Sequence, residues 1–354
     1  MNNDRIQEIL DLMEEARLDY FLISDPQSIA YCTGYYNDPH ERMFVFMISK
    51  HGNHTLFMND LFYLEHDLDV NIVWHKDGQD AIQTIVDEMH FPGRIGIDKN
   101  WASHFLLDLM KKLPDAKYIN ASPCVDLVRM KKDLQEQVLM IESSKINDAV
   151  MEEIIPFIQE GVTEKQLAKK LDELFFNHHS TCYGAIVAFG KNAADPHHEN
   201  DDTPLRKGDC VLIDMGCVYK GYCSDMTRTF FYEGILEEEI KVYEIVKKAN
   251  EAAEAMIKPG VKLSDIDKCA RKVISDEGYG KYFTHRLGHF IGRDVHEYGD
   301  VSSVNEMEVE EGMIFSIEPG IYLEGNFGVR VEDLVMVTKD GCQVLNSFTK
   351  DIYI

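Results

Sequence analysis

Two stretches decide the fold of this chain: Cys210-Val211-Leu212-Ile213-Asp214-Met215-Gly216-Cys217 and Cys223-Ser224-Asp225-Met226-Thr227-Arg228-Thr229-Phe230-Phe231-Tyr232. They read as the apolar arms of an antiparallel hairpin that turns near Tyr219-Lys220-Gly221. With the turn centred near Tyr219 and Lys220, Asp214 and Asp225 lie opposite each other on one face. Two carboxylates this close repel each other without a cation, although either aspartate alone is typical of a turn or an exposed strand.

Outside the hairpin, the chain has two parts that differ in the order of their strand-like and helix-like runs. The first part alternates short strand-like and helix-like runs up to about Pro123, which indicates an α/β domain. From Leu134 onward, long helices combine with strands in antiparallel order, which indicates an α+β domain. We therefore predict an N-terminal domain over residues 1–124 and a second domain over residues 125–354, as expected for 354 residues.

Composition narrows the class of protein. A formal charge of −26 without a basic cluster argues against nucleic acid and anionic lipid as partners. The longest apolar stretch near either end, Met43 to Ile48, is far shorter than the roughly 20 residues of a membrane span. The first residues lack a basic leader with an apolar block, and the eight cysteines have no regular spacing. We expect a cytoplasmic protein with reduced cysteines and no membrane contact.

Further acids and histidines sit in apolar surroundings. Glu318 lies in Phe315-Ser316-Ile317-Glu318-Pro319-Gly320, and Glu332 lies in Val329-Arg330-Val331-Glu332-Asp333. Carboxylates in apolar strands are costly unless they are paired or bound to metal. A stretch punctuated by glycines adds three imidazoles, His285, His289 and His296, although a packed core or surface position is the usual explanation for one histidine alone.

These motifs together resemble those of the pita-bread metallopeptidases, in particular the Xaa-Pro dipeptidases (prolidases) and aminopeptidase P. Tyr31-Cys32-Thr33-Gly34 is similar to the Tyr-x-Thr-Gly of their N-terminal domain, and Arg129-Met130-Lys131-Lys132-Asp133 is similar to their interdomain signature. The likeness covers essentially the whole chain. It implies the α+β fold of a pita-bread (creatinase/aminopeptidase-like) catalytic domain, preceded by an α/β creatinase-type N-terminal domain.

The resemblance also implies a site with two divalent metal ions per subunit. Its ligands would be Asp214, Asp225, His289, Glu318 and Glu332, with Asp225 and Glu332 bridging the ions. An oxygen-rich ligand set of this kind suits Mn²⁺, with Co²⁺ or Zn²⁺ as alternatives. In the family, the Glu318 position accepts a proton, and histidines at the positions of His197, His285 and His296 surround the substrate. His198 has no counterpart, and we expect it to be a surface-loop histidine.

Three arginines enter the interpretation. Arg330 shares a strand face with Glu332, so we predict that it orients or neutralises the carboxylates rather than lying exposed. Arg286, like Phe290, stands where the family often has glycine. By the resemblance both would narrow the space beside the metals, although a packing role is the more usual one for a residue such as Phe290. Arg293 is predicted to bind the carboxylate of a dipeptide substrate, with a surface ion pair as the alternative.

The function expected from the resemblance is hydrolysis of the Xaa-Pro bond of dipeptides. The alternatives are an aminopeptidase P that acts on longer Xaa-Pro peptides, a creatinase-like amidinohydrolase, and a metal-free binding module; the last two should have lost the metal ligands. The resemblance also implies a homodimer, in which residues 37–42 of one subunit could form a lid over the partner's site.

Overall fold

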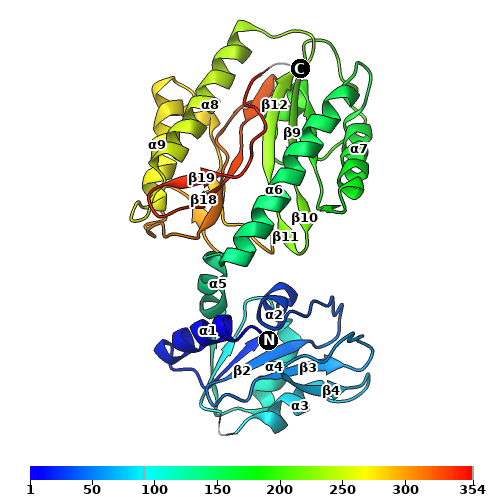
Figure 1. Cartoon of the computed structure of the whole chain (residues 1–354), viewed down its shortest axis with the longest axis vertical. Helices are drawn as coiled ribbons and strands as arrows, with labels where there is room; N and C mark the ends of the chain where they lie inside the picture. Colours follow the sequence, from blue (N-terminus) through cyan, green and yellow to red (C-terminus); the bar gives the residue numbers. More distant parts are fainter. Residues whose placement is uncertain (91, 353–354) are drawn as a thin grey trace. The chain divides into compact units, whose positions relative to one another are not determined.

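The computed structural model describes residues 1–90 and 92–352, and the chain divides into two compact units, Met1–Arg129 and Met130–Ile354 (Figure 1). The boundary that we predicted after residue 124 lies inside helix α5 (Ser122–Met130). The difference has a packing cause, because Val125 and Val128 belong to the apolar core of the first unit. Most of this helix therefore belongs to the N-terminal domain.

The first unit is built on one six-stranded sheet in the order β4-β3-β2-β1-β5-β6. Its strands are β1 (Tyr20–Ile23), β2 (Val45–Ser49), β3 (Thr55–Asn59), β4 (Asn71–His75), β5 (Arg94–Ile97) and β6 (Lys117–Asn120). Its other helices are α1 (Asn3–Glu15), α2 (Pro26–Thr33), α3 (Ala81–Glu88) and α4 (Ser103–Lys112). Apolar clusters cover both faces of the sheet, so the central strand β1 is buried along its whole length. The predicted α/β class is confirmed.

The two short motifs of the first half mark helix ends. Gly34 closes α2 with a φ of 80°, a left-handed conformation that glycine adopts without strain. The Thr33 hydroxyl donates to the Ile29 carbonyl at 2.7 Å and accepts the Tyr35 N–H at 3.1 Å. At the end of the second motif, the Asp133 carboxylate accepts the N–H groups of Gln135 and Glu136 and begins the long helix α6 (Leu134–Ile154).

The segment of residues 37–42 is a turn in the first unit. The Asp38 carboxylate accepts the His40 N–H at 3.0 Å, and His40 has a φ of 50° with a largely exposed ring. At the end of the segment, the Arg42 guanidinium donates two hydrogen bonds to Asp77, at 3.0 and 2.9 Å. The turn thus has a defined shape within its own domain, and its proposed action as a lid stays a prediction.

The second unit combines antiparallel sheets with helices. Three-stranded sheets have the orders β12-β9-β8, β15-β18-β19 and β11-β10-β7, and two-stranded sheets join β16 with β17 and β13 with β14. The strands are β7 (Thr181–Cys182), β8 (Ile186–Phe189), β9 (Cys210–Met215), β10 (Cys217–Tyr219), β11 (Tyr222–Cys223), β12 (Met226–Phe231), β13 (Gly288–His289), β14 (Asp300–Val301), β15 (Ile314–Ile317), β16 (Gly320–Leu323), β17 (Phe327–Arg330), β18 (Asp333–Val337) and β19 (Cys342–Val344). The remaining α-helices are α7 (Glu164–Asn177), α8 (Glu237–Met256) and α9 (Leu263–Asp276). Helix α6 packs beside α7, and α8 packs beside α9 (Figure 1).

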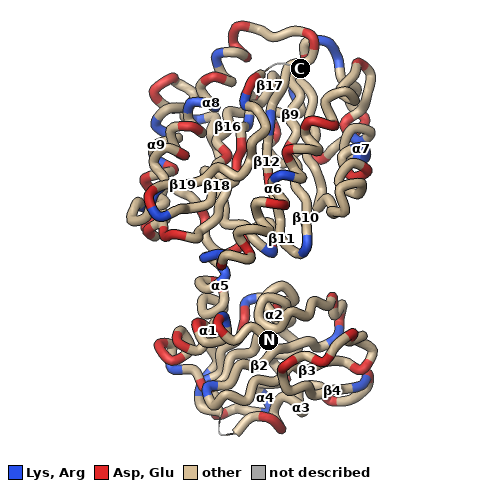
Figure 2. The backbone as a smooth tube through the Cα atoms, viewed as in Figure 1, with Lys and Arg blue, Asp and Glu red and all other residues tan. Residues whose placement is uncertain are grey.

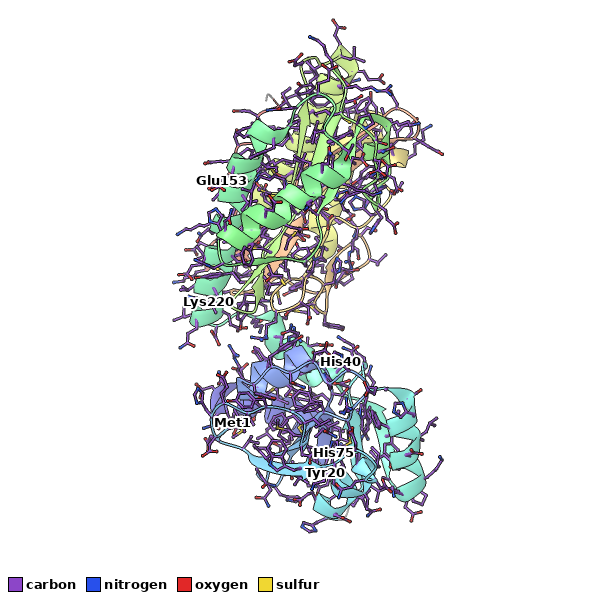
Figure 3. The ribbon with its side chains drawn as sticks, turned by 90° about the vertical axis from the view of Figure 1, so that its right-hand side faces the viewer. Met1, Tyr20, His40, His75, Glu153 and Lys220 are labelled. Carbon is purple, nitrogen blue, oxygen red and sulfur yellow. The ribbon has the colours of Figure 1, made fainter. Side chains whose placement is uncertain are left out.

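The hairpin of β9 to β12 has a different register from the one predicted. Lys220 and Gly221 both have positive φ, 49° and 83°, which makes a two-residue turn centred one residue later than expected. Figure 3 labels Lys220 in this turn. Asp214 therefore lies opposite Thr227, and the prediction that it faces Asp225 directly is wrong. Asp225 lies two residues before Thr227 and on the same side of the strand, so the carboxylates of Asp214 and Asp225 form a diagonal pair.

Charged side chains of both signs are interspersed along the backbone of each unit (Figure 2). Within residues 1–90 and 92–352, no helix combines the length and the apolar character needed to cross a bilayer. All eight cysteines are free thiols.

Candidate metal centre

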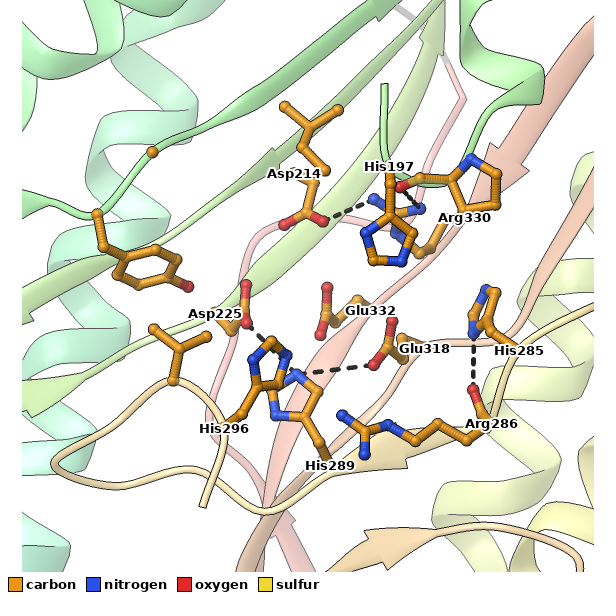
Figure 4. Close-up of a pocket in the computed structure, with 15 residues that line it drawn as sticks. His197, Asp214, Asp225, His285, Arg286, His289, His296, Glu318, Arg330 and Glu332 are labelled. Atoms are coloured by element: carbon orange, nitrogen blue, oxygen red, sulfur yellow. Dashed lines mark hydrogen bonds and ion pairs between the residues drawn. The ribbon is translucent and has the colours of Figure 1, made fainter. Parts of the chain in front are cut away.

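A cavity of about 390 Å³ in the second unit gathers nearly all of the predicted site residues (Figure 4). Among the described residues that line it are His197, Asp214, Asp225, His285, Arg286, His289, His296, Glu318, Arg330 and Glu332. Of the predicted site residues, Arg293 alone is missing from this lining. Predicted site residues up to 135 positions apart in the sequence, from His197 to Glu332, therefore face one space.

The five predicted ligands come from the ends of paired strands. Asp214 lies on β9 and Asp225 directly before the neighbouring strand β12. Glu318 follows β15, and Glu332 precedes β18, the partner of β15. His289 ends β13, and its N–H donates to the Ser316 hydroxyl of β15 at 3.0 Å. Hydrogen-bonded strands thus hold all five side chains in place.

His289 presents a lone pair to two carboxylates. Its Nδ1 lies 3.2 Å from the Phe290 carbonyl oxygen, which can only accept, so Nδ1 carries the proton. Burial, and next the nearby His296, lower the pKa of His289 to about 3, so the ring is neutral and Nε2 is an acceptor. Nε2 lies 3.7 Å from oxygens of both Asp225 and Glu318, which are acceptors too. Three acceptors converging in this way fit a cation between them.

The buried carboxylates also lack enough nearby positive charge to stabilise their ionised forms. Burial, followed by the charges of neighbouring carboxylates, raises the pKa of Asp225 and of Glu332 well above their ordinary values. Burial likewise raises the pKa of Glu318 to about 7. Ligand atoms of Asp225, His289 and Glu332 lie within 4.8 Å of one another. The residues present therefore fit divalent cations, which would hold the carboxylates ionised at neutral pH.

Arg330 ties several of these groups together. Its guanidinium donates to Asp214 at 2.6 Å and, through Nε, to the Thr227 hydroxyl at 3.1 Å. Thr227 in turn donates to Glu332 at 2.7 Å. The remaining bonds of Arg330 go to the Tyr322 hydroxyl and the Pro196 carbonyl. Arg330 is buried, so this arrangement has the geometry of an orienting arginine.

Tyr322 is a site residue that the sequence reasoning missed. His285 Nδ1 lies 2.7 Å from the Arg286 carbonyl oxygen and therefore carries the proton. Burial, followed by the charge of Arg330, lowers the pKa of His285 to about 4, so its Nε2 accepts from the Tyr322 hydroxyl at 2.8 Å. The same hydroxyl accepts from Arg330 at 3.0 Å. No sequence motif marked this tyrosine; its position opposite Gly328 in the β16–β17 pair brings it to the site.

Two further histidines face the cavity from different segments. The ring of His296 meets that of His289 edge to face at 4.3 Å between centroids. Burial lowers the pKa of His296, and the ring is exposed on its cavity side. His197 is exposed on the loop after the short helix η2 (Gly190–Ala194), where its N–H donates to the Asp195 carboxylate at 3.0 Å. Both rings are placed to contact a bound molecule.

His198 is not the surface-loop histidine that we expected. Its side chain is 12% exposed, and its Nε2 lies 2.6 Å from a carboxylate oxygen of the fully buried Glu164. Glu164 also accepts the N–H groups of Phe189 and Asp201 at 2.8 and 3.0 Å and the Asn192 amide at 2.9 Å. This carboxylate therefore links the first turn of α7 to the loop that carries His197.

The contacts of Arg293 and of its neighbours explain why Arg293 does not line the cavity. Its N–H donates to Glu297 at 2.9 Å, and Glu297 forms a buried ion pair with Lys132 at 2.9 Å. The guanidinium lies against the Gly221 turn and 5.4 Å from the centroid of the Tyr222 ring. Phe290 has the packing role that we favoured for it, because it is buried against Phe315, with ring centroids 5.3 Å apart.

Comparison with known proteins agrees with this architecture. Residues 138–339 match metallopeptidase family M24, and residues 5–131 match the creatinase/prolidase N-terminal domain. An uncharacterized peptidase of Staphylococcus aureus is 35% identical over 355 residues, covering 98% of this chain and 99% of the relative. A dipeptidase from Pyrococcus horikoshii is 35% identical with a TM-score of 0.92, covering 99% of both chains. A prolidase from Thermococcus sibiricus is 32% identical with a TM-score of 0.94, covering 100% of this chain and 99% of that chain. The chain belongs to metallopeptidase family M24, and it is a pita-bread protein of the Xaa-Pro dipeptidase and aminopeptidase P type.

Proposed function

We propose that this protein is a dipeptidase that hydrolyses the Xaa-Pro bond of dipeptides with two divalent metal ions per subunit. One observation carries the proposal: the Nε2 lone pair of His289 faces Asp225 and Glu318 at 3.7 Å in a cavity with four carboxylates. The names of a similar dipeptidase and a similar prolidase support the choice of reaction. Among the metals, Mn²⁺ is proposed first, followed by Co²⁺ and Zn²⁺.

The metal ions, when bound, supply an activated water and stabilise negative charge on the scissile carbonyl oxygen. Asp214, Asp225, His289, Glu318 and Glu332 are the residues proposed to hold them. Glu318 is the proposed proton acceptor, because its carboxylate lies at the cavity wall with the Ser316 hydroxyl donating to it at 3.2 Å. Arg330 and Thr227 keep Asp214 and Glu332 oriented.

The histidines of the cavity bind and orient substrate in this proposal. His197 and His296 are exposed to the cavity and can donate to a substrate carbonyl. His285 cannot donate from Nδ1 to substrate, because that proton is used by the Arg286 carbonyl; it acts by holding the Tyr322 hydroxyl. A proline substrate brings a tertiary amide without N–H, so recognition has to come from its carbonyl, its ring and its termini.

The main alternative is an aminopeptidase P that removes the first residue from longer Xaa-Pro peptides. A metal-free binding module is less consistent with a cluster of buried carboxylates that need a cation. The test is hydrolysis of Leu-Pro beside Leu-Pro-Ala by the metal-supplemented protein, with products identified. Faster cleavage of Leu-Pro supports the dipeptidase, faster cleavage of Leu-Pro-Ala supports aminopeptidase P, and cleavage of neither contradicts both.

The proposal includes a homodimer in the cytoplasm. The free thiols of all eight cysteines are consistent with a reducing compartment. Arg293 stays the sequence-based prediction for the contact with the substrate carboxylate, and residues 37–42 stay the predicted lid. Light scattering of the purified protein should give twice the 40.7 kDa of one chain; a mass near 40.7 kDa would remove the dimer from the proposal.

A further inference from the structure

Three buried asparagines of the second unit share one kind of contact. Among the residues that the structure describes there, the buried asparagines are Asn147, Asn250 and Asn346, with exposed fractions of 0%, 0% and 6%. Each donates its side-chain amide to the backbone carbonyl of a proposed carboxylate ligand or of the residue next to one. The three come from separate segments, which are α6, α8 and the stretch after β19. The same contact made from three segments indicates a common role.

Two of the asparagines reach the aspartate ligands. The Asn147 amide donates to the Met215 carbonyl at 3.0 Å, one residue after Asp214. The Asn346 amide donates to the carbonyl of Asp225 itself at 3.2 Å. The pairing of β9 with β12 ends beside these residues, so the ladder alone does not hold the backbone there. The two amides restrain the backbone of both aspartates at the end of the ladder.

Asn250 reaches both glutamate ligands. Its amide donates to the Ile317 carbonyl at 2.9 Å and to the Val331 carbonyl at a longer 3.5 Å. These two residues directly precede Glu318 and Glu332. Both glutamates lie in the interval between the β15–β18 pair and the β16–β17 pair, where the strand ladder is interrupted. One side chain of α8 therefore bridges the two glutamate segments at the point where strand pairing stops.

The partners of the amide oxygens fix the orientation of two of these side chains. Asn250 Oδ1 accepts from the Lys350 ammonium at 2.5 Å, and Asn346 Oδ1 accepts the Leu334 N–H at 2.7 Å. Both partners can only donate, so the NH₂ groups face the carbonyls. Asn147 Oδ1 has no hydrogen-bond partner among the described residues. A buried oxygen without a partner destabilises the fold, so the stability of the fold does not account for Asn147.

We propose that Asn147, Asn250 and Asn346 are positioning residues that fix the spacing of the four carboxylate ligands. The inference rests on the proposed function, because it takes the dinuclear metal site from it. Buried carboxylates without a cation repel one another, so their backbone needs restraint to keep them close together before a cation binds. Groups that orient metal ligands from behind typically change metal affinity by roughly 10 to 100-fold. A purely structural role would change stability and leave metal affinity as it is.

The test measures metal binding separately from turnover. Asn147→Leu, Asn250→Leu and Asn346→Leu each remove the amide and largely keep the volume of the side chain. The matched control is Asn59→Leu, because Asn59 is 1% exposed and its amide donates to Asp77 in the first unit. Each full-length, metal-free protein is titrated with Co²⁺ against a competing chelator, and the visible absorption of the bound Co²⁺ is recorded. Tm and the hydrolysis of Leu-Pro at saturating Co²⁺ are measured in parallel.

We expect each of the three variants to bind Co²⁺ ~10 to 100-fold more weakly than wild type and to change the visible absorption, which reports ligand geometry. At saturating Co²⁺, kcat for Leu-Pro should fall while KM changes by less than ~3-fold, because these asparagines do not line the cavity. Asn59→Leu should lower Tm and leave Co²⁺ affinity and absorption unchanged. The same pattern in the three variants, a lower Tm with wild-type Co²⁺ affinity and absorption, overturns the proposal.

Asn250→Asp and Asn346→Asp serve as a second test if a leucine variant does not fold. They keep the size and the accepting oxygen and lose the N–H donor, so a changed Co²⁺ absorption is expected. An absorption identical to that of wild type overturns the proposal. If the variants alter Co²⁺ binding but wild type loaded with Co²⁺ cleaves no Xaa-Pro peptide, the positioning role stands and the proposed hydrolysis fails.

Discussion

At the scale of single residues, burial and hydrogen bonding set the protonation state of the side chains in the candidate metal centre. His289 is neutral because it is buried, and its Nδ1 proton is committed to a backbone carbonyl, so its Nε2 can only accept. The carboxylates around it have raised pKa values for the same reason, burial, with mutual repulsion added. Several buried carboxylates this close together are unfavourable as anions unless bound cations compensate their negative charge.

Replacing either proposed bridging ligand should remove the metal and the activity. We expect Asp225→Asn and Glu332→Gln each to lose most of the bound metal and to hydrolyse Leu-Pro at least ~10²-fold more slowly, since an amide binds a hard cation weakly. Elemental analysis and a hydrolysis assay measure this, and circular dichroism checks the fold. Near-normal activity with two metals per chain in either variant would contradict the dinuclear assignment.

His296 should affect the reaction without affecting the metal. Its ring lies 4.3 Å from that of His289 and lines the cavity, where we propose that it contacts substrate. His296→Ala is expected to lower kcat by about 10²-fold, the usual scale for a lost transition-state contact, at unchanged metal content. His51→Ala, in the N-terminal domain, is a matched control that should leave both quantities unchanged. Loss of metal in His296→Ala would instead make it a ligand.

At the scale of elements, strand pairing and one buried carboxylate position the chemistry. The β9–β12 ladder places Asp214 opposite Thr227, and Thr227 holds Glu332. The loop that carries His197 is held on one side by Arg330 at the Pro196 carbonyl and on the other by the contact of His198 with Glu164. A loop joined at both sides to buried groups keeps its exposed histidine aimed at the cavity.

The contact between His198 and Glu164 should therefore act through His197. His198→Ala is expected to lower kcat/KM for Leu-Pro by roughly 10-fold, on the scale of one lost hydrogen bond to a charged group, with unchanged metal content. His198→Gln keeps an N–H donor and should recover most of the activity. In the double variant His197→Ala/His198→Ala, the second change should add little. Fully additive effects in this cycle would show that His198 does not act through His197.

At the scale of the whole molecule, the carboxylate centre links stability to pH and metal. The folded-state pKa of Glu318 is about 7 against an ordinary 4.5, and those of Asp225 and Glu332 are raised in the same direction. Acids with raised pKa bind more protons in the folded than in the unfolded state between the two values. The free energy of unfolding of the metal-free protein should then fall as pH rises from about 4.5 to about 7.

This dependence can be measured as Tm against pH with and without metal. We expect the metal-free protein to lose stability between pH 5.5 and pH 8 by on the order of 2 kcal/mol from Glu318 alone, and the metal-loaded protein to lose less. Bound cations keep the ligand carboxylates ionised in the folded state, so the raised pKa values that cause the loss of stability are no longer present. Metal-free Glu332→Gln, which lacks one of the acids, should show a smaller drop than metal-free wild type. Parallel curves with and without metal would contradict the link.

The sequence by itself determined the two-domain class and the composition of the centre. Alternating strand and helix patterns, apolar runs interrupted by Glu318 and Glu332, and the motifs around Asp214, Asp225 and His289 are local features, and local features can be read along a chain. The domain boundary was placed too early because the burial of Val125 and Val128 depends on a core formed by distant strands.

What the tertiary structure decided is which side chains meet. A shift of the turn by one residue moved Asp214 from opposite Asp225 to opposite Thr227, since hairpin register depends on the conformation of Lys220 and Gly221. Tyr322, Glu164 and His198 had no motif, and their contacts join segments 34 to 37 positions apart. Whether an arginine faces the cavity, as Arg286 does, or packs against a neighbouring turn, as Arg293 does, depends on backbone direction and packing partners, and no spacing in the sequence encodes these.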